Sequence, residues 1–301
     1  MSKSEQSDRV VLPFPLTHRA CVSPFLSAPP WIVCTVLLGV NNNSIKEKKQ
    51  EQKHLRKMRF LPIFLASLWP FLVTANELSC GKLFYRTLYL DQENNELYIG
   101  AMDRVLKVPN LFNISQTDCT KDALVLEPDN VSNCASRGKN MEYECRNHIR
   151  VIQKIDENRL YICGTNAHSP KDLVVYSNLT HLARHEFYAG VGDGVAKCPF
   201  DPEDNSTAIW VKTGNPGGHA ALYSGTNAEF TKADPIIFRG DIFDENTGRR
   251  EYTFKRTIKY DSHMLDKPDF VGSYEVGDYV YFFYRETAVE YMNCGKTIYS
   301  R

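Results

Sequence analysis

Two histidines and a glycine-rich stretch have the spacings that come nearest to a chemical motif. His181 and His185 are four residues apart, as in a zinc-binding pair on a helix, but no second acidic motif and no third ligand accompany them. Gly190-Val-Gly192-Asp-Gly194 is similar to a dinucleotide-binding loop, but it lacks the βαβ context and the rest of that fingerprint. We therefore predict a turn at the glycines, and we expect neither a metal nor a cofactor.

The common motifs of catalysis are missing from the sequence. There is no G-x-S-x-G, no H-E-x-x-H and no Walker motif. Asp201, Glu203 and Asp204 form an acidic loop, but a calcium site needs more oxygen ligands than one loop offers, so a solvated surface is expected. We nominate no catalytic residue and predict that the protein is not an enzyme.

The composition is that of a folded protein with no nucleic-acid signature. The chain has 301 residues, 43% of them hydrophobic, with 36 basic and 36 acidic side chains. Residues 1–75 hold 10 basic and 4 acidic side chains, which leaves 26 basic and 32 acidic ones in residues 76–301. This acidic bulk argues against a phosphate-binding surface, so no nucleic-acid partner is expected.

A secretory signal peptide is predicted at residues 58–75. Basic residues beside Met58 precede an apolar run over residues 60–73, and small side chains at Val73 and Ala75 favour cleavage after Ala75. The run is shorter than the roughly 20 residues of a membrane span, and a buried core helix is the alternative. The protein is therefore expected to be secreted and extracellular.

Residues 1–57 precede the position at which a signal peptide normally begins. We expect Met58 to be the physiological start and residues 1–57 to be a disordered or artefactual extension. An uncleaved membrane anchor at residues 31–40 is the alternative, although this run is too short to cross a bilayer.

Cysteines and glycosylation sequons agree with a secretory route. Seven of the nine cysteines lie in residues 76–301, namely Cys80, Cys119, Cys134, Cys145, Cys163, Cys198 and Cys294. None has the spacing of a zinc site. Predicted glycosylation sites are the four Asn-x-Ser/Thr sequons at Asn113, Asn130, Asn178 and Asn205. Together with the signal peptide, these features predict an oxidising compartment.

Seven cysteines cannot all pair within residues 76–301. Either one thiol pairs between two chains, or its partner lies beyond Arg301, and we expect the second for Cys294. Cys134 and Cys145 are close enough in sequence for a local disulfide, worth about 3 kcal/mol on the chain-entropy account.

A sequence pattern repeats about every 62 residues in residues 76–301. Leu97-Tyr-Ile-Gly-Ala101 recurs as Leu160-Tyr-Ile-Cys-Gly-Thr-Asn-Ala167, as Leu222-Tyr-Ser-Gly-Thr-Asn-Ala228 and, more loosely, as Val280-Tyr-Phe-Phe-Tyr-Arg285. Each copy follows a polar turn and another β-rich run, and these runs cover residues 84–90, 149–155, 208–212 and 270–276. Such runs, separated by Gly, Pro, Asn and Asp, predict antiparallel strands.

A repeat of this length with about four strands is typical of a β-propeller blade. The repeated glycine is expected where the backbone bulges or where another segment approaches closely. A β-sandwich with chance similarity between its strands is the alternative. Residues 76–301 hold between three and four repeats, whereas propellers close with about 4–8 blades. We therefore predict the front part of a larger propeller, poorly soluble alone because its apolar faces are exposed.

Five separated motifs, all in the same order, resemble the sema domain of semaphorins. They are Leu97-Tyr-Ile-Gly-Ala-Met-Asp103, Tyr161-Ile-Cys-Gly-Thr-Asn166, Ala196-Lys-Cys-Pro-Phe-Asp-Pro202, Leu222-Tyr-Ser-Gly-Thr226 and Tyr281-Phe-Phe-Tyr-Arg-Glu-Thr-Ala-Val-Glu-Tyr291. The resemblance implies a seven-bladed propeller of four-stranded blades, with about the first three to four in residues 76–301. It also implies that the sema domain is truncated at its C-terminus, and that a cystine-rich module and an immunoglobulin-like domain normally follow.

The resemblance also implies disulfides. Cys134 and Cys145 match a disulfide of the family. Many relatives carry a second cysteine shortly after the Cys-Gly-Thr motif, but residues 166–172 contain none. Cys163 must therefore pair elsewhere or stay free, and Cys198 is its candidate partner. By elimination, Cys80 is expected to pair with Cys119.

One basic segment is a candidate for recognition. Arg249-Arg250, Lys255-Arg256 and Lys259 fit a solvated edge strand, or a rim that contacts an acidic receptor patch or a sulfated glycan. In semaphorins the receptor-contacting face lies around the third and fourth blades, where this segment should fall. We therefore nominate as receptor-facing residues Lys259, Tyr260, Asp261 and His263.

The resemblance implies a secreted, non-catalytic guidance ligand. Such a ligand is a homodimer, binds plexin receptors and repels growing axons, which is chemorepellent activity in negative chemotaxis. A fragment of a sema-domain receptor, such as a plexin, is one alternative, and a membrane span with a kinase or GTPase-regulating domain would distinguish it. A secreted propeller hydrolase is the other, and it would need carboxylates and an arginine converging on the channel mouth.

Overall fold

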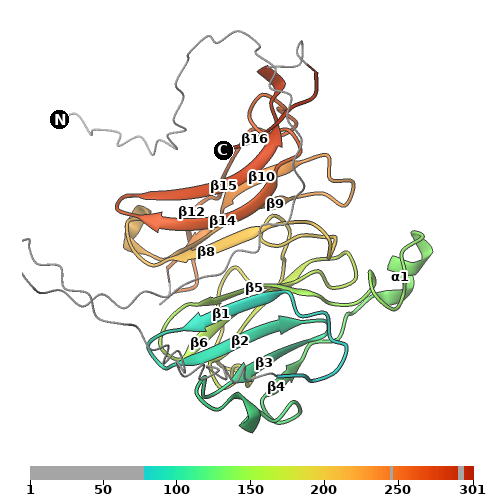
Figure 1. The fold of residues 1–301 in the computed structure, drawn as a ribbon. Coiled ribbons are helices and arrows are strands. Elements are labelled where there is room, and N and C mark those ends of the chain that lie inside the picture. The colour runs from blue at the N-terminus through green and yellow to red at the C-terminus, as the bar shows by residue number, and fades with distance from the viewer. Residues whose placement is uncertain (1–77, 245–246, 291–294) are drawn as a thin grey trace, which may run out of the picture. The chain divides into compact units, whose positions relative to one another are not determined.

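Antiparallel sheets make up nearly all the regular structure of the chain (Figure 1). The computed structural model describes residues 78–244, 247–290 and 295–301. The strands of the first sheet are, in order, β1 (Thr87–Asp91), β2 (Glu96–Ala101), β3 (Arg104–Val108) and β4 (Ala123–Val125). Those of the second sheet are β5 (Ile149–Lys154), β6 (Arg159–Gly164) and β7 (Lys171–Tyr176).

Two further sheets and a small hairpin follow along the chain. The strands of the third sheet are β8 (Thr207–Val211), β9 (Ala221–Asn227), β10 (Pro235–Arg239) and β13 (Lys255–Arg256). The strands of the fourth sheet are β14 (Asp269–Val276), β15 (Tyr279–Thr287) and β16 (Ile298–Ser300). The hairpin consists of β11 (Ile242–Phe243) and β12 (Arg250–Tyr252). The helical segments are α1 (Val131–Ser136) and the 3₁₀ turns η1 (Ile114–Gln116) and η2 (Pro216–Gly218). The predicted all-β class is confirmed.

The turn between β1 and β2 shows how polar residues reverse the chain between two strands. The Asp91 carboxylate accepts hydrogen bonds from the backbone N–H groups of Glu93 (3.1 Å) and Asn94 (3.4 Å). Asn95 has a φ of 60°, a left-handed conformation that asparagine tolerates. These local contacts set the register in which Asp91 pairs with Glu96.

Successive sheets pack against one another through their first strands. β1 lies against β5, β5 against β8, and β8 against β14. A side-chain hydrogen bond crosses each junction: from Thr87 Oγ1 to the Ile149 carbonyl oxygen (2.9 Å), from Gln153 Nε2 to the Ala208 carbonyl oxygen (3.1 Å), and between the Thr207 and Ser273 hydroxyls (2.8 Å). The four main sheets of the described residues thus pack in series. This is the arrangement of propeller blades and not the two facing layers of a sandwich.

The repeated glycines lie where another segment comes close. A Cβ at Gly100 would be 3.0 Å from the Ile149 carbonyl oxygen on the next sheet. One at Gly225 would be only 2.5 Å from the Phe270 ring, also on the next sheet. At Gly164 the obstructing group is the Asn147 side chain. Close packing therefore requires glycine at these positions, as expected from the repeat.

The number of strands differs from four in two of the main sheets. In the second sheet, a single bridge between Val175 and His181 takes the place of a fourth strand. The chain turns at Leu179, which has a φ of 63°, and Leu182 then packs toward the core instead of continuing along β7. The fourth sheet has three strands within the described residues.

Both faces of the second sheet are buried because the sheet lies between two others. Along β6, Leu160 and Ile162 join a core that contains Tyr98 of the first sheet. The alternate residues Tyr161 and Cys163 join a core shared with the third sheet. All five side chains are at most 2% exposed. Alternation along one strand thus supplies apolar side chains to two interfaces.

One face of the fourth sheet is rich in exposed aromatic side chains. Tyr274 and Tyr281 are paired across β14 and β15 and are 58% and 43% exposed. Val276 and Tyr279 form the next pair on this face, and Phe283 lies beside Tyr274, with 5.8 Å between the ring centroids. A contiguous apolar surface of this kind is typical of a contact surface. It fits the expectation that residues 76–301 alone leave apolar blade surface exposed.

Several sequence predictions lie outside the described residues. They are the extension at residues 1–57, the signal peptide at residues 58–75 and the pairing of Cys294. Within the described ranges, no helix has the length and apolar character needed to span a membrane.

Candidate functional site

The disulfides tie loops to the sheets. In the described part of the chain, the bonded pairs are Cys80–Cys119, Cys134–Cys145 and Cys163–Cys198, the same pairs that the sequence analysis expects. The second of these closes the segment that carries α1, and both of its cysteines are buried. Cys163 belongs to β6, so the third disulfide attaches the segment before β8 to the second sheet.

The four sequons differ in their surroundings. Asn130, Asn178 and Asn205 are exposed, whereas Asn113 is half-buried. Asn178 Oδ1 accepts hydrogen bonds from the backbone N–H (3.0 Å) and the hydroxyl (2.6 Å) of Thr180, the third residue of its sequon. The Asn205 amide instead donates to Asp269 Oδ1 over 2.5 Å.

Two of the nominated receptor-facing residues, Lys259 and Tyr260, meet at Glu229. Lys259 Nζ lies 2.8 Å from Glu229 Oε1, and the Tyr260 hydroxyl donates to the same oxygen over 2.6 Å. Lys259 Nζ also lies 4.6 Å from the Tyr260 ring centroid, within the range of a cation–π contact. Tyr260 is 62% exposed and has a left-handed φ of 60°. The three residues, called the Tyr260 cluster below, form an ordered and solvent-accessible surface.

The charges within the Tyr260 cluster compensate one another. The hydrogen bonds from Lys259 and Tyr260 hold the pKa of Glu229 below its ordinary value. The same Glu229 carboxylate raises the pKa of Lys259. Lys259 thus presents a paired ammonium group, and the exposed tyrosine ring is the main contact area of the cluster.

The other two nominated residues shape the turn that follows. Asp261 Oδ1 accepts a hydrogen bond from the His263 backbone N–H over 2.9 Å. The Asp261 carbonyl oxygen accepts from the N–H groups of Met264 and Leu265, both at 3.1 Å. Leu265 is buried in the core of the fourth sheet. Asp261 therefore anchors the turn, and the His263 side chain remains exposed.

The rest of the basic segment is divided between two environments. Arg256 forms a two-pronged ion pair with Asp234, at 3.0 and 2.6 Å, and is half-buried. Arg250 lies 3.7 Å from Asp241. Lys255 is exposed on β13, the edge strand of the third sheet. The segment is thus a charged edge strand with internal ion pairs, and not a continuous basic rim.

The turn at residues 229–232, which was not predicted from the sequence, carries the Glu229 of the Tyr260 cluster. Residues 229–232 carry Glu229 at one end and Lys232 at the other, and Lys232 has a φ of 59°. Lys232 Nζ pairs with Asp201 (2.8 Å) and Asp204 (2.5 Å) of the acidic loop. Burial opposes ionisation of Asp201, but the Lys232 ammonium outweighs it and holds the pKa of Asp201 below its ordinary value. No motif marks this turn in the sequence.

The acidic loop holds three sheets together. Arg150, in β5 of the second sheet, donates to the carbonyl oxygens of Pro202 and Asp204, both at 2.5 Å. Glu203 pairs with Arg86, just before β1, at 3.4 Å and accepts a hydrogen bond from the Tyr143 hydroxyl. Burial lowers the pKa of Arg150 to about 10. The loop is consequently a structural connection in which Asp201 and Asp204 are half-buried, and only Glu203 is exposed as the sequence predicts.

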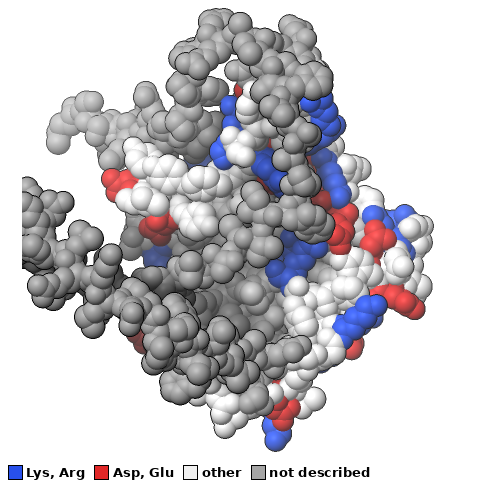
Figure 2. Space-filling view, viewed as in Figure 1, with Lys and Arg blue, Asp and Glu red and all other residues white. Residues whose placement is uncertain are grey.

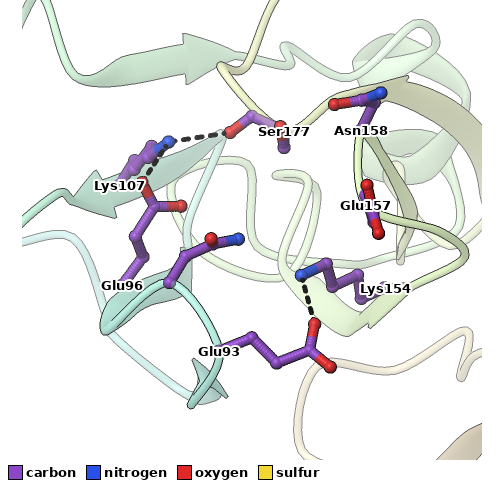
Figure 3. Close-up of a pocket in the computed structure, with 8 residues that line it drawn as sticks. Glu93, Glu96, Lys107, Lys154, Glu157, Asn158 and Ser177 are labelled. Atoms are coloured by element: carbon purple, nitrogen blue, oxygen red, sulfur yellow. Dashed lines mark hydrogen bonds and ion pairs between the residues drawn. The ribbon is translucent and has the colours of Figure 1, made fainter.

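A polar pocket lies between the first two sheets, at the ends of two hairpins (Figure 3). Its lining comprises Glu93, Asn94, Glu96, Lys107, Lys154, Glu157, Asn158 and Ser177. Lys154 pairs with Glu93 at 3.1 Å, and Lys107 with Glu96 at 2.8 Å. The lysine charges are thus compensated within the pocket, and no arginine joins the glutamates in its lining. Across the described ranges, no group of three His, Cys, Asp or Glu side chains has the arrangement of a metal site.

Comparisons with known proteins decide the family. No protein-family model matches the chain. A semaphorin-2A of Schistocerca gregaria is 65% identical over 227 residues, which cover 75% of this chain and 32% of the relative. The chain belongs to the semaphorin family.

Solved structures extend this similarity to the fold. Drosophila Semaphorin 2a matches with a TM-score of 0.74 at 60% identity, over 75% of this chain and 37% of that chain. A chain of the structure of Drosophila Plexin A in complex with Semaphorin 1b matches with a TM-score of 0.54 at 29% identity, over 72% and 36% of the two chains. The four sheets are therefore blades of a sema-domain propeller. The present semaphorin chain spans about a third of the length of the locust relative.

On the face of the semaphorin chain shown in Figure 2, lysine and arginine side chains lie beside aspartate and glutamate side chains. Basic side chains are also paired with acidic ones at Arg256, Lys232 and Lys259.

Proposed function

We propose that this chain is the front part of the sema domain of a secreted guidance ligand whose receptor is a plexin. The 65% identity with a semaphorin-2A carries the proposal. The similarity to a chain in the complex of Drosophila Plexin A with Semaphorin 1b supports a plexin as the partner. The ligand would act without catalysis, presenting a fixed surface while the receptor generates the repulsive signal in growing axons.

The receptor-facing surface is proposed to centre on the Tyr260 cluster, with His263 beside it. Two features support this assignment: the exposed Tyr260 ring, and its fixation by Glu229 over 2.6 Å. Tyrosine is favoured at interfaces because it covers a large area and loses little side-chain entropy on binding. Asp261 contributes by fixing the turn from which His263 projects.

The whole protein is proposed to be an extracellular homodimer with N-linked glycans at its four sequons. Two copies of the receptor surface in one molecule raise the apparent affinity for membrane-bound receptors by about 10²–10⁴. Sulfated glycans are proposed as an additional partner of exposed basic residues such as Lys255 and Arg249. We expect no nucleic-acid partner.

Binding of the secreted protein to plexin ectodomains tests the proposal. We expect the wild-type protein to bind, Tyr260→Ala and Lys259→Glu to weaken binding by about tenfold or more, and Lys255→Glu to leave it within about twofold. Lys255 is the matched control because it is an exposed lysine on the edge strand of the same sheet. No binding by a folded wild-type protein would refute the ligand assignment. Equal losses in all three variants would refute the proposed surface.

A further inference from the structure

His168 is an unusual residue in the described part of the chain. Its side chain is buried, with 3% of its surface exposed, and neither ring nitrogen has a hydrogen-bond partner in the structure. Buried polar groups are normally paired, because an unpaired one loses its hydration without compensation. The other buried histidine, His148, follows that rule, since its Nε2 lies 2.8 Å from the Tyr143 carbonyl oxygen.

The backbone holds His168 in place. Asn166, Ala167 and His168 have consecutive left-handed φ values of 42°, 54° and 57°. The Ser169 N–H donates to the carbonyl oxygens of Thr165 (3.0 Å) and Asn166 (3.1 Å), and Ala167 packs against the Cys134–Cys145 disulfide. The backbone that carries the buried imidazole is therefore held by local hydrogen bonds and by the packing of Ala167.

The ring of His168 packs edge-to-face against Phe230 in the 229–232 turn, with 5.2 Å between the centroids. Arg137 and Lys139, from the segment that carries α1, lie 5.5 and 5.8 Å from the centroid of the Phe230 ring. Phe230 is thus enclosed by an imidazole and two cations. The two cations favour a neutral imidazole, because a third positive charge beside the Phe230 ring would be repelled by them.

The charged groups around His168 come from three segments. Lys139 and Glu144 belong to the segment that the Cys134–Cys145 disulfide closes, Asp201 to the acidic loop, and Lys232 to the 229–232 turn. Both carboxylates already have partners, since Glu144 lies 2.8 Å from Lys139 and Asp201 lies 2.8 Å from Lys232. A protonated His168 would have to take one of these carboxylates from its lysine or leave its site. Burial and the Lys139 charge lower the pKa of His168, while Asp201 and Glu144 act in the opposite direction.

We propose that protonation of His168 releases the 229–232 turn and thereby loosens the Tyr260 cluster. The connection is short: Phe230 contacts His168, and its neighbour Glu229 holds both Lys259 and Tyr260. The cluster is ordered at neutral pH and loosened in acidic surroundings, such as those that follow uptake of a receptor complex into cells. This effect on binding rests on the proposed receptor surface, whereas release of the turn does not.

Hydrogen exchange of the chain, read by mass spectrometry without any receptor, tests release of the turn. Labelling at about pH 7.5 and about pH 5.5, corrected for intrinsic exchange, should show faster exchange, by up to about tenfold, in residues 225–235 of the wild type at the lower pH. His168→Asn keeps a residue suited to a left-handed backbone, and His168→Phe keeps an aromatic ring. Both variants should exchange at nearly equal rates at the two pH values. His263→Asn, which removes an exposed histidine close to Tyr260, should keep the wild-type response.

Two outcomes of the exchange experiment overturn the proposal. One is wild-type exchange in residues 225–235 that does not depend on pH. The other is an undiminished pH response in both His168 variants. If neither variant folds, exchange at the imidazole C2 position in the wild type gives the pKa of each histidine. A His168 that titrates at or above the ordinary value of about 6.5 refutes the proposal. Because no receptor is present, failure here is distinguishable from failure of plexin binding.

Discussion

The Tyr260 hydroxyl donates a hydrogen bond to Glu229 Oε1 over 2.6 Å, which links an exposed ring on one turn to a carboxylate on another. The two residues are 31 positions apart, and Glu229 directly follows the third copy of the sequence repeat. Glu229 therefore helps to fix the positions of the exposed Tyr260 ring and of Lys259.

Replacement of Glu229 separates its two roles. Glu229→Gln keeps an amide oxygen for the Tyr260 hydroxyl but removes the charge that pairs with Lys259, whereas Glu229→Ala removes both. We expect plexin binding to fall by about two- to fivefold in Glu229→Gln and by a larger factor in Glu229→Ala, because only the second frees the Tyr260 ring. Surface plasmon resonance on the purified variants measures both. Equal affinities for the two variants would argue against fixation of the ring.

Gly225 is expected to be intolerant of even the smallest side chain. An added Cβ would lie 2.5 Å from the Phe270 ring, so Gly225→Ala should lower the free energy of unfolding by about 1–3 kcal/mol through overpacking. Gly240→Ala is the matched control, because the nearest atom to its added Cβ is 3.7 Å away. Its effect should stay within about 0.5 kcal/mol in chemical denaturation. A similar loss in both variants would show that backbone flexibility, and not the junction between sheets, is responsible.

The exposed aromatic face of the fourth sheet should drive self-association of residues 76–301. The double variant Tyr274→Lys with Tyr281→Lys places two charges at one cross-strand pair of this face. Sedimentation velocity should then show a larger monomer fraction than in the wild type. Phe112→Lys removes an aromatic side chain that is 82% exposed but lies outside the sheet, and it should leave association unchanged. An equal effect of Phe112→Lys would mean that general hydrophobicity is the cause.

Acid is expected to destabilise the protein in two separate pH ranges. The pKa of His168 is lowered on folding, so stability falls as pH decreases from about 6.5 toward the folded-state pKa. The pKa of Asp201 is also lowered, but from about 3.9, so its contribution is complete above that value and is lost as pH falls through its folded-state pKa. Lys232→Met removes the main partner of Asp201.

Thermal unfolding between about pH 7 and 2 distinguishes the two groups. His168→Asn should reduce the slope of Tm against pH near pH 6 and keep the slope below about pH 4. Lys232→Met should reduce the slope below about pH 4 and also the slope near pH 6, because it frees Asp201 to pair with a protonated His168. Parallel curves for the wild type and both variants would contradict this assignment.

Much of the fold follows directly from the sequence, since the repeat places the strands well. The runs predicted at residues 149–155 and 270–276 correspond to β5 and β14, which end within one residue of each run. The repeated glycines also lie at close approaches, because sheets packed in series leave no space for a Cβ beside the next strand. A local sequence pattern therefore predicts a strand or a close approach where the equivalent residues of successive sheets have similar surroundings.

The missing fourth strand of the second sheet was not predictable in the same way. His181 can pair with only one residue of β7, because Leu179 reverses the chain and Leu182 packs inward. Tertiary packing thus overrides the repeat at this position. The nomination of Lys259 and Tyr260 identified two members of a real cluster, but not Glu229, whose role depends on a contact between turns that carries no sequence signal.

The packing of His168 on Phe230 has an evolutionary consequence. The two positions are 62 residues apart and belong to different blades, yet their rings are in contact, so a change of size or charge at one is expected to affect the other. If the histidine at position 168 is lost, an uncharged aromatic residue is no longer required at position 230, and that position can then change. Paralogues in which both positions have changed together are expected to lack the dependence on pH proposed for the 229–232 turn.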